Sequence, residues 1–458
     1  MLPGSVQGVG RAAALHTDTG ARPAVRQRGR HHGVLPRAAR GVLLLVLAAA
    51  CGGANGGAAD ADGAGSAAAG SDAAGSAAVR PGIDVLLAGD AAPLAGRRVG
   101  LITNHTGRTA DGRSTIDALA ADPRVELVAL FSPEHGIRGT ADAGERVTDE
   151  VDDATGLPIY SLYGQTRAPT PAMLAGLDAL AFDIQDIGTR YYTYVWTMTL
   201  AMEAAAGAGI PFVVLDRPNP IGGLVQGNVL DTAYATFVGL HPVPMRHGLT
   251  AGELATFVNV EFRVGAELTV IPAEGWTRDL WFDGTGLEWR PPSPNMPSLE
   301  SAAHYPGTCL FEGTNLSVGR GTPMAFQQIG APWLAADTLA ARLTARALPG
   351  VRIEAVTFTP SAPGDGKYDG EAVPGLRFTV TDRATYDPTV TAVAVLVELM
   401  RLHPDELTFR VAHFDRLAGS DRLRLQLLEG AEVEAIVAPW DARRTAFEAA
   451  ARRHHLYP

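Results

Sequence analysis

The sequence predicts an α/β protein with a Rossmann-like N-terminal domain, built on a parallel sheet, and a smaller mixed α/β C-terminal domain. From about residue 84, short apolar runs alternate with amphipathic stretches, which is the pattern of βα units. Four of the apolar runs stop in unusual polar clusters. After about residue 236 a proline-dense stretch and a mixed pattern of strands and helices replace this rhythm. A chain of 458 residues has room for both domains and a targeting segment.

The first 51 residues predict a signal sequence. Arginines precede the uncharged run GVLLLVLAAAC, which has the length of a signal-peptide h-region and is too short to span a bilayer. Cys51 closes this run, so we expect a lipoprotein signal with a lipid anchor at Cys51, although Ala48 stands where such signals prefer leucine. A plain secretory signal is the alternative. Either signal predicts an exported protein of the periplasm or cell envelope.

Residues 52–82 are rich in Gly, Ala, Ser and Asp and predict a flexible tether. Cys309 is the only other cysteine, so no disulfide within the chain is expected. The chain has 38 basic and 49 acidic residues, a formal net charge of -11. This charge argues against a nucleic-acid partner.

Four apolar runs of the N-terminal half are predicted strands, at residues 99–103, 125–131, 177–184 and 210–216. Helices are predicted between them, over residues 114–121 and 195–209. Ligands of open α/β sheets bind beyond the carboxyl ends of the strands, so the polar side chains that follow these strands should meet at one edge. These side chains are Asn104, His105, Glu134, His135, Gln185, Asp186, Arg190, Arg217 and Asn219.

Several well-known motifs are absent. No G-x-G-x-x-G follows the first strand and no P-loop occurs, so no nucleotide or other cofactor is expected. G-x-S-x-G and C-x-x-C are also missing, which removes support for a serine hydrolase and for a structural zinc site.

The C-terminal pattern begins with a helix from Thr250, where Glu253 completes a capping-box signature. The later predicted elements are strands within residues 268–276, 351–360 and 375–382 and helices over 389–404 and 440–454. We place the two domains at residues 83–304 and 305–458 and expect the active-site cleft between them, because domain junctions commonly hold ligands.

Seven motifs resemble, in order and spacing, those of the NamZ-type exo-β-N-acetylmuramidases, a family long described as a domain of unknown function. They are ITNHTG, FSPEHGIRG, FDIQDIGTRYYTY, LDRPNPIGG, RHGLTAGELA, PSPNMPS and YPGTCLFEGTNLSVGRGT. The resemblance extends over residues 84–458 and implies the same two domains with a cleft between them. It also implies the activity, which is release of terminal N-acetylmuramic acid from the non-reducing end of peptidoglycan fragments in cell-wall turnover.

Glycoside hydrolysis needs a carboxylic acid for the leaving oxygen and normally a second group as nucleophile or base. Glu134 is the candidate acid, because Pro133 and the apolar strand end should desolvate its carboxyl group. His135 is expected to orient this acid or share its proton. Asp186 and Glu312 are equal candidates for the second group.

Two further groups belong to the predicted active site, one from the protein and one from the sugar. Asp183 is expected to be a buried structural acid that pairs with Arg190 or caps a turn. The 2-acetamido oxygen of the sugar is a possible internal nucleophile.

Recognition of a muramic sugar requires a cation for its lactyl carboxylate and an aromatic surface for its ring. Arg190 and Arg320, with Arg246 behind them, are the candidate cations, and Tyr191 and Tyr192 are the candidate aromatic residues. The candidate readers of hydroxyl and amide groups are Asn104, His105, Asn219, Asn295 and Asn315.

Two other functions stay open from the residues alone. His105, His135, Asp183 and Asp186 could form the centre of a metal-dependent hydrolase, but no H-x-H or H-E-x-x-H spacing supports it and no metal is expected. The other alternative is a non-catalytic lipoprotein that binds cell-wall sugars, for which Glu134 would not matter.

Overall fold

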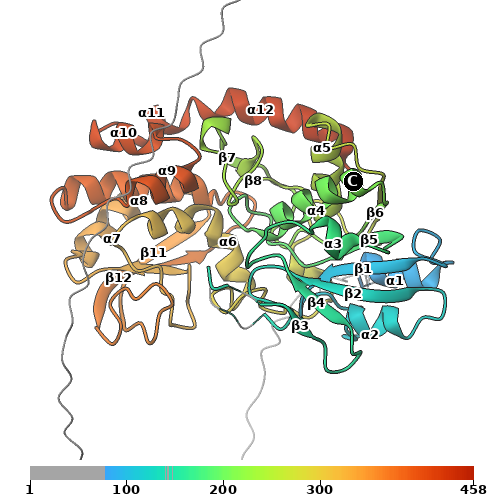
Figure 1. Ribbon diagram of the computed structural model, residues 1–458. Helices are drawn as coiled ribbons and strands as arrows, with labels where there is room; N and C mark the ends of the chain where they lie inside the picture. Colours follow the sequence, from blue (N-terminus) through green and yellow to red (C-terminus); the bar gives the residue numbers. More distant parts are fainter. Residues whose placement is uncertain (1–77, 140, 142–143, 147) are drawn as a thin grey trace, which may run out of the picture. The chain divides into compact units, whose positions relative to one another are not determined.

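The computed structural model describes residues 78–139, 141, 144–146 and 148–458 (Figure 1). The predicted signal sequence, Cys51 and most of the predicted tether lie outside the described residues, and these predictions stay predictions. Residues 78–82, however, belong to the fold: Val79 is buried, Arg80 pairs with Glu274 and a helix begins at Gly82. In the described part of the chain, no helix is long and apolar enough to cross a membrane.

A seven-stranded sheet forms the N-terminal half, in the order β3-β4-β2-β1-β5-β6-β9. All neighbouring strands are parallel except β3 and β4. The prediction of parallel strands whose carboxyl ends share one edge is therefore confirmed. The strands are β1 (Arg98–Thr103), β2 (Glu126–Ser132), β3 (Glu150–Val151), β4 (Pro158–Ser161), β5 (Ala179–Asp183), β6 (Phe212–Leu215) and β9 (Leu268–Ile271).

The strand order reverses at β1, which lies between β2 and β5. The strand β2 therefore lies on one side of β1, and β5 and β6 lie on the other side. In the register of β1 with β5, Thr103 lies beside Asp183, so the polar segments that follow these two strands leave the sheet as neighbours. In doubly wound sheets such a point is where ligands bind.

Helices cover both faces of the sheet, so its central strands are buried on both sides. On one face, α1 (Gly82–Ala88) and α2 (Thr115–Ala120) pack on side chains such as Leu101. On the other, α4 (Tyr194–Ala208) and α5 (Ala251–Glu261) pack on side chains such as Phe182 (Figure 1). The predicted capping box of α5 is confirmed, with Thr250 and Glu253 bonded reciprocally.

The C-terminal half contains a three-stranded antiparallel sheet in the order β10-β12-β11 with helices beside it. The strands and helices predicted near residues 351–360, 375–382, 389–404 and 440–454 are all present. Helix α6 (Leu299–Thr308) runs through the predicted domain boundary at residues 304 and 305, and this boundary stays a prediction. The remaining elements are α3 (Pro171–Leu174), β7 (Gln226–Val229), β8 (Pro244–Arg246), the 3₁₀ helix η3 (Cys309–Gly313), β10 (Gln328–Gly330), α7 (Ala336–Ala345), β11 (Val351–Phe358), β12 (Val373–Val380), α8 (Pro388–Leu402), α9 (Val411–Ala418), α10 (Arg422–Leu428), α11 (Val433–Val437) and α12 (Trp440–Ala451), besides three short 3₁₀ turns.

The C-terminus returns to the N-terminal sheet after α12 (Figure 1). The Tyr457 hydroxyl donates to Asp216 at 2.6 Å and accepts from the Ala273 amide at 2.9 Å. The amide of Arg278 donates to the carbonyl of Pro458 at 3.0 Å. Tyr457 is thus part of the core beside β6 and β9.

Candidate active site

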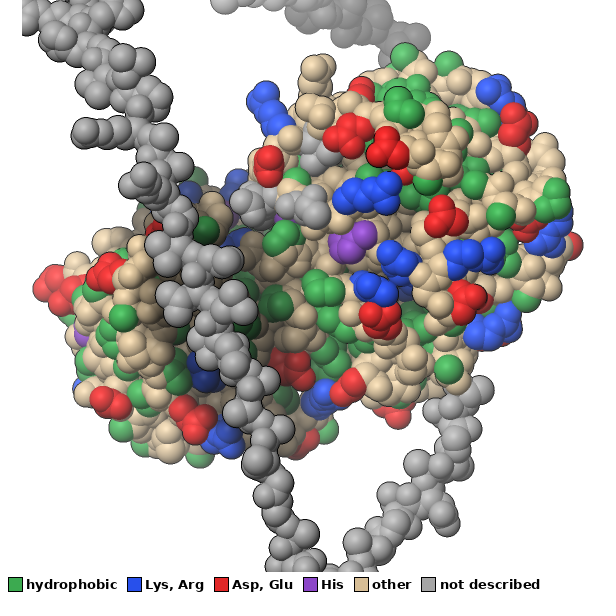
Figure 2. Space-filling view, turned by 90° about the horizontal axis from the view of Figure 1, so that it is seen from below, with side chains coloured by type: hydrophobic (Ala, Val, Ile, Leu, Met, Phe, Trp, Pro, Cys, Tyr) green, Lys and Arg blue, Asp and Glu red, His purple; other side chains and the backbone are tan. Residues whose placement is uncertain are grey.

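A pocket at the carboxyl edge of the sheet is lined by residues of both halves of the chain. It encloses about 670 Å³, including the space open to solvent at its mouth. Figure 2 shows that the face seen there is hollowed between the two halves. The predicted site residues that line the pocket are Glu134, His135, Tyr191, Tyr192, Asn295, Glu312 and Arg320.

Glu134 follows β2 and is buried at this edge. Its Oε1 accepts a hydrogen bond from the Gly144 amide at 2.9 Å, and its Oε2 accepts one from the Thr193 hydroxyl at 2.5 Å. Burial, the charge of Glu134 and a hydrogen bond to it raise the pKa of Tyr163 to about 12, so this phenol keeps its proton at neutral pH. Two donors from two segments, the Gly144 amide and the Thr193 hydroxyl, therefore hold the carboxyl group in one orientation.

His135 turns the chain sharply after Glu134. It has φ +70°, in the left-handed region, and Gly136 follows with φ +73°. Such a conformation in a residue other than glycine costs on the order of 1 kcal/mol, and strain of this kind is concentrated at functional sites. The His135 Nδ1 lies 2.6 Å from the Ala141 carbonyl, which can only accept, so Nδ1 carries the proton and Nε2 is free to accept one. No hydrogen bond joins it to Glu134 among the described residues, so its orienting role stays a prediction.

Glu312 and Arg320 form an ion pair in the lining of the pocket. Arg320 Nε donates to Glu312 Oε1 at 2.7 Å, and Nη2 lies 2.5 Å from the same oxygen. Burial opposes the charge of Glu312, but the charge and hydrogen bonds of Arg320 outweigh it and lower the pKa of this carboxyl group. Glu312 is thus an ionised carboxylate inside the pocket.

Asp186, the other candidate for the second group, does not line the pocket. Its Oδ2 accepts from the Gly188 amide at 2.7 Å and lies 3.6 Å from His247 Nε2. Burial and the charges of Glu134 and Asp186 raise the pKa of Tyr192. Asp186 is thus outside the lining of the pocket, and its carboxylate contacts Gly188 and His247.

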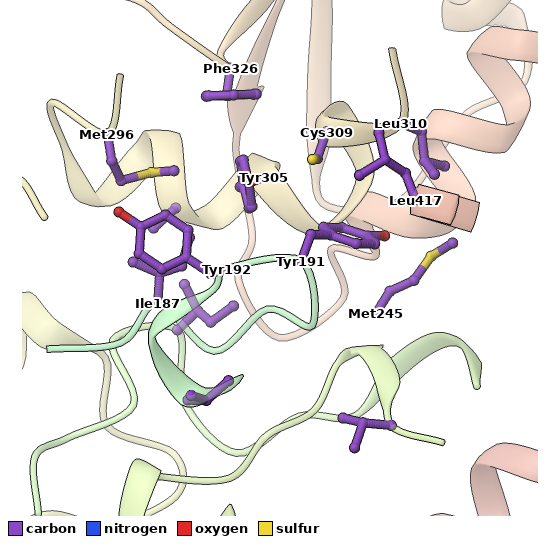
Figure 3. Close-up of a cluster of buried hydrophobic side chains, with 14 of the residues drawn as sticks. Ile187, Tyr191, Tyr192, Met245, Met296, Tyr305, Cys309, Leu310, Phe326 and Leu417 are labelled. Atoms are coloured by element: carbon purple, nitrogen blue, oxygen red, sulfur yellow. The ribbon is translucent and has the colours of Figure 1, made fainter. Parts of the chain in front are cut away.

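Tyr191 and Tyr192 point from the loop after β5 toward α6 (Figure 3). Both rings meet Tyr305 edge to face, at centroid distances of 6.1 Å and 5.9 Å. The Tyr191 hydroxyl donates to the Pro306 carbonyl at 2.9 Å, which leaves its ring, and not its hydroxyl, for a ligand. The two tyrosines therefore join the two halves of the pocket wall.

Two predicted cations are structural. Arg190 is fully buried, and its guanidinium donates to the carbonyls of Asn228, Val243 and Leu417. Burial lowers the pKa of Arg246 to about 10, and its guanidinium donates to Gln226 and to the Ile221 carbonyl. Neither arginine lines the pocket, and only Nε of each guanidinium lacks a hydrogen-bond partner among the described residues, so the contacts give no support to the prediction that Arg190 or Arg246 meets a ligand carboxylate.

Three other expectations need correction. The Asn219 amide donates to Leu249 and accepts from Ile221, so it fixes a turn. The Asn315 side chain is bonded to residues 406 and 408 in the same way. Asp183 is a buried structural acid as expected, but its partner is Arg217 and not Arg190.

Asn104 and His105 lie at the end of β1, next to the pocket but not in its lining. Asn104 accepts from the amide and hydroxyl of Thr106. His105 Nε2 lies 2.7 Å from the Pro291 carbonyl. Burial lowers the pKa of His105, and the charges of Arg108, His135 and Arg290 lower it further. The hydrogen bond to the Pro291 carbonyl raises the pKa but does not outweigh these effects.

Several residues that line the pocket were not among the candidates. Tyr163 follows β4, which is too short and proline-bearing to stand out, and His413 on α9 has no local signal at all. Thr193, Tyr194, Ser293 and Tyr305 lie inside the quoted motifs, and their residue types alone do not distinguish a ligand contact from packing or a turn. These six residues line the pocket with Val238, Met296, Cys309, Phe326 and Leu417.

The described residues contain no group of three or more His, Cys, Asp or Glu side chains placed to hold a metal ion. A doubly wound sheet with a buried, oriented carboxyl group, an ionised second carboxylate and aromatic walls in one pocket defines a hydrolase of the glycosidase class. The comparisons agree. Two models of one family match the chain, Exo-beta-N-acetylmuramidase NamZ, N-terminal, over residues 99–300, and its C-terminal counterpart over residues 303–457. The chain belongs to the exo-β-N-acetylmuramidase NamZ family.

Individual relatives support the same conclusion. The peptidoglycan β-N-acetylmuramidase NamZ of Bacillus subtilis (strain 168) is 45% identical over 381 residues, which are 83% of this chain and 91% of that protein. Two crystal structures of DUF1343 family proteins from Bacteroides fragilis NCTC 9343 have the same fold. One has a TM-score of 0.78 at 38% identity and the other 0.68 at 32%, each over 83% of this chain and 99% of the other.

Proposed function

We propose that the pocket is where the chain releases terminal N-acetylmuramic acid from the non-reducing end of peptidoglycan fragments, with Glu134 as the proton donor. The class of activity follows from the family: the chain is a peptidoglycan glycosidase, an exo-β-N-acetylmuramidase. One observation carries the assignment of Glu134. It is the buried carboxyl group that a central strand delivers into a pocket with aromatic walls, and two donors fix its orientation.

The proposed reaction begins with proton transfer from Glu134 to the oxygen of the scissile bond as that bond breaks. The Thr193 hydroxyl suits both protonation states of Glu134, because it can donate to the carboxylate and accept from the acid. Positive charge then develops at the anomeric carbon. Glu312 is the second carboxylate of the pocket, and its lowered pKa keeps it negative while this charge forms.

Arg320 is the proposed contact for the lactyl carboxylate, the group that distinguishes muramic acid from glucosamine. Its bonds to Glu312 use Nε and Nη2, which leaves Nη1 without a hydrogen bond among the described residues. The guanidinium can therefore bridge Glu312 and a ligand carboxylate.

The test uses residues 78–458, which keep the contacts of Val79 and Arg80 with the fold. A nitrophenyl β-N-acetylmuramide should be cleaved and the matching glucosaminide should not. Glu134→Gln should lose about 100- to 10,000-fold in kcat, since that is the usual size of general acid catalysis. Glu126→Gln, an exposed change at the start of the same strand, is the matched control and should keep full activity.

A natural disaccharide separates the role of acid from other roles of Glu134. Nitrophenolate leaves without much protonation, whereas a sugar alcohol does not, so Glu134→Gln should lose far more activity on the disaccharide than on the nitrophenyl muramide. Equal losses would mean that Glu134 does not supply the proton. A folded wild type with no activity on either substrate would favour the non-catalytic sugar-binding lipoprotein.

We also infer that the protein is exported and anchored by a lipid at Cys51, on the side of the membrane where its substrate lies. This rests on the h-region and the cysteine that closes it. Radiolabelled palmitate should enter the full chain and not Cys51→Ala, and the variant should move from the membrane fraction to the soluble fraction. Label in both proteins would rule out this anchor.

A further inference from the structure

A second cavity lies at the point where the strand order of the sheet reverses. It encloses about 560 Å³, including the space open to solvent. Its walls come from the segments that follow β1, β5 and β6 and from residues 287–290, and no residue of its lining belongs to the pocket that holds Glu134. The function proposed above makes no use of this cavity.

The cavity offers both donors and acceptors. Arg108 uses Nε and Nη1 on the carbonyls of His105 and Gly112, and Arg217 uses Nε and Nη2 on Asp183 and on the Arg108 carbonyl. Their remaining nitrogens and Nη1 of Arg290 have no hydrogen bond among the described residues. Asp111 and Glu288 supply carboxylates to the same walls. Cations and acids are thus mixed, which suits a neutral ligand with many hydroxyl groups better than an anion.

Apolar surface completes the lining. Pro81, Phe282 and Leu287 border the cavity beside the polar groups. A hexosamine has the matching character, with carbon-bound hydrogens on its ring face and hydroxyl and acetamido groups at its edge.

This cavity and the pocket of Glu134 are neighbours. His105 stands between them: its carbonyl accepts from Arg108 Nε of the cavity at 3.0 Å, and its Nε2 lies 2.7 Å from the carbonyl of Pro291. One segment borders both: Arg290 lines the cavity, and Ser293 lines the pocket. Three residues of chain span at most about 10 Å. Prolines at 291, 292 and 294 keep this segment stiff.

We infer that the cavity binds the hexosamine on the leaving side of the scissile bond, while the pocket of Glu134 holds the terminal muramic acid. This inference rests on the proposed function, because an enzyme that removes a terminal sugar must place the rest of the chain outside the pocket of that sugar. Residues 290–293, which border both, then lie beside the glycosidic bond that joins the two sugars.

The experiment compares a muramyl disaccharide with a nitrophenyl muramide, which has no second sugar. Ala110→Trp fills the cavity from an exposed position without removing a side-chain hydrogen bond, and Arg290→Ala removes a partly exposed donor. Each change should raise KM for the disaccharide at least 10-fold and leave KM and kcat for the nitrophenyl muramide within 2-fold. Arg352→Ala, an exposed change on β11, is the control and should alter neither substrate.

The outcomes separate this inference from the proposed function. Unchanged disaccharide kinetics in both variants, or equal losses on the two substrates, would overturn the leaving-side site while the muramidase activity of the wild type stands. No activity of the wild type on either substrate would instead remove the proposed function itself.

Discussion

The hydroxyl of Thr193 contacts Glu134 although its position in the chain is that of a helix cap. Thr193 is the N-cap residue of α4, yet its side chain makes no capping hydrogen bond. A threonine at such a position normally bonds the amides of its own helix. Here the hydroxyl donates to Glu134 Oε2, and α4 forgoes that cap.

This arrangement predicts a loss of both catalysis and stability. Thr193→Val removes a buried hydrogen bond to a charged group, worth about 1.5–3 kcal/mol, so kcat should fall about 10- to 100-fold and the free energy of unfolding should fall by up to about that amount. Thr193→Ser keeps the hydroxyl and should stay near the wild type in both measurements. Steady-state kinetics with urea titrations would check this, and an unchanged kcat in the valine variant would contradict the role.

Some site residues could be predicted because their signals are local. Glu134, Tyr192 and Glu312 stand in unusual motifs at strand ends or beside prolines, and the pocket includes all three. The contacts of Arg190 could not be predicted because its partners are remote in sequence: the Leu417 carbonyl, for example, is 227 residues away. No local pattern reveals that a buried arginine is satisfied by backbone oxygens from elsewhere in the fold.

At the level of elements, α5 depends on a cap with two functions. The Thr250 hydroxyl accepts from the Glu253 amide and donates to Asp216 Oδ2 at 2.7 Å, next to the end of β6. Thr250→Ala should therefore lower the free energy of unfolding by about 1–2 kcal/mol. Thr250→Ser keeps both bonds and should recover most of it. Urea titrations at constant m-value would test this, and equal stabilities of the alanine and serine variants would refute it.

Strands and helices long enough to show a repeating pattern of apolar residues could be predicted from the sequence. Very short strands could not. The buried strands β1, β2, β5 and β6 have continuous apolar runs, and α5 and α8 have caps and long apolar faces. β4 has the sequence PIYS and β10 has only QIG, which is less than two periods of alternation. Such strands form because neighbours in the sheet supply their hydrogen bonds, and this is a property of tertiary structure.

For the whole molecule, the buried contact between Asp216 and Tyr457 predicts a dependence of stability on pH. Burial raises the pKa of Asp216 to about 6, against hydrogen bonds from Tyr457, Thr250 and Gly252 that lower it. The folded state therefore holds this proton more tightly than the unfolded chain. The stabilisation is complete below a pH of about 4 and is lost as the pH rises through about 6.

The measurement is the free energy of unfolding at pH 4.5 and 7 for the wild type and Asp216→Asn. Two units of pKa correspond to about 3 kcal/mol, so the wild type should lose up to about that much between these pH values relative to the variant. Asp153→Asn, an exposed change, should follow the wild type. Parallel pH profiles for the wild type and Asp216→Asn would show that Asp216 does not titrate in this range.

The same contact also orders the events of biosynthesis. Asp216 is made early, but the hydroxyl that covers it belongs to a residue made 241 positions later, next to the last one. While the ribosome still holds the final residues, the first half of the protein lacks part of its core and cannot finish folding. A chain that lacks Tyr457 would therefore leave the Asp216 carboxyl group without this donor.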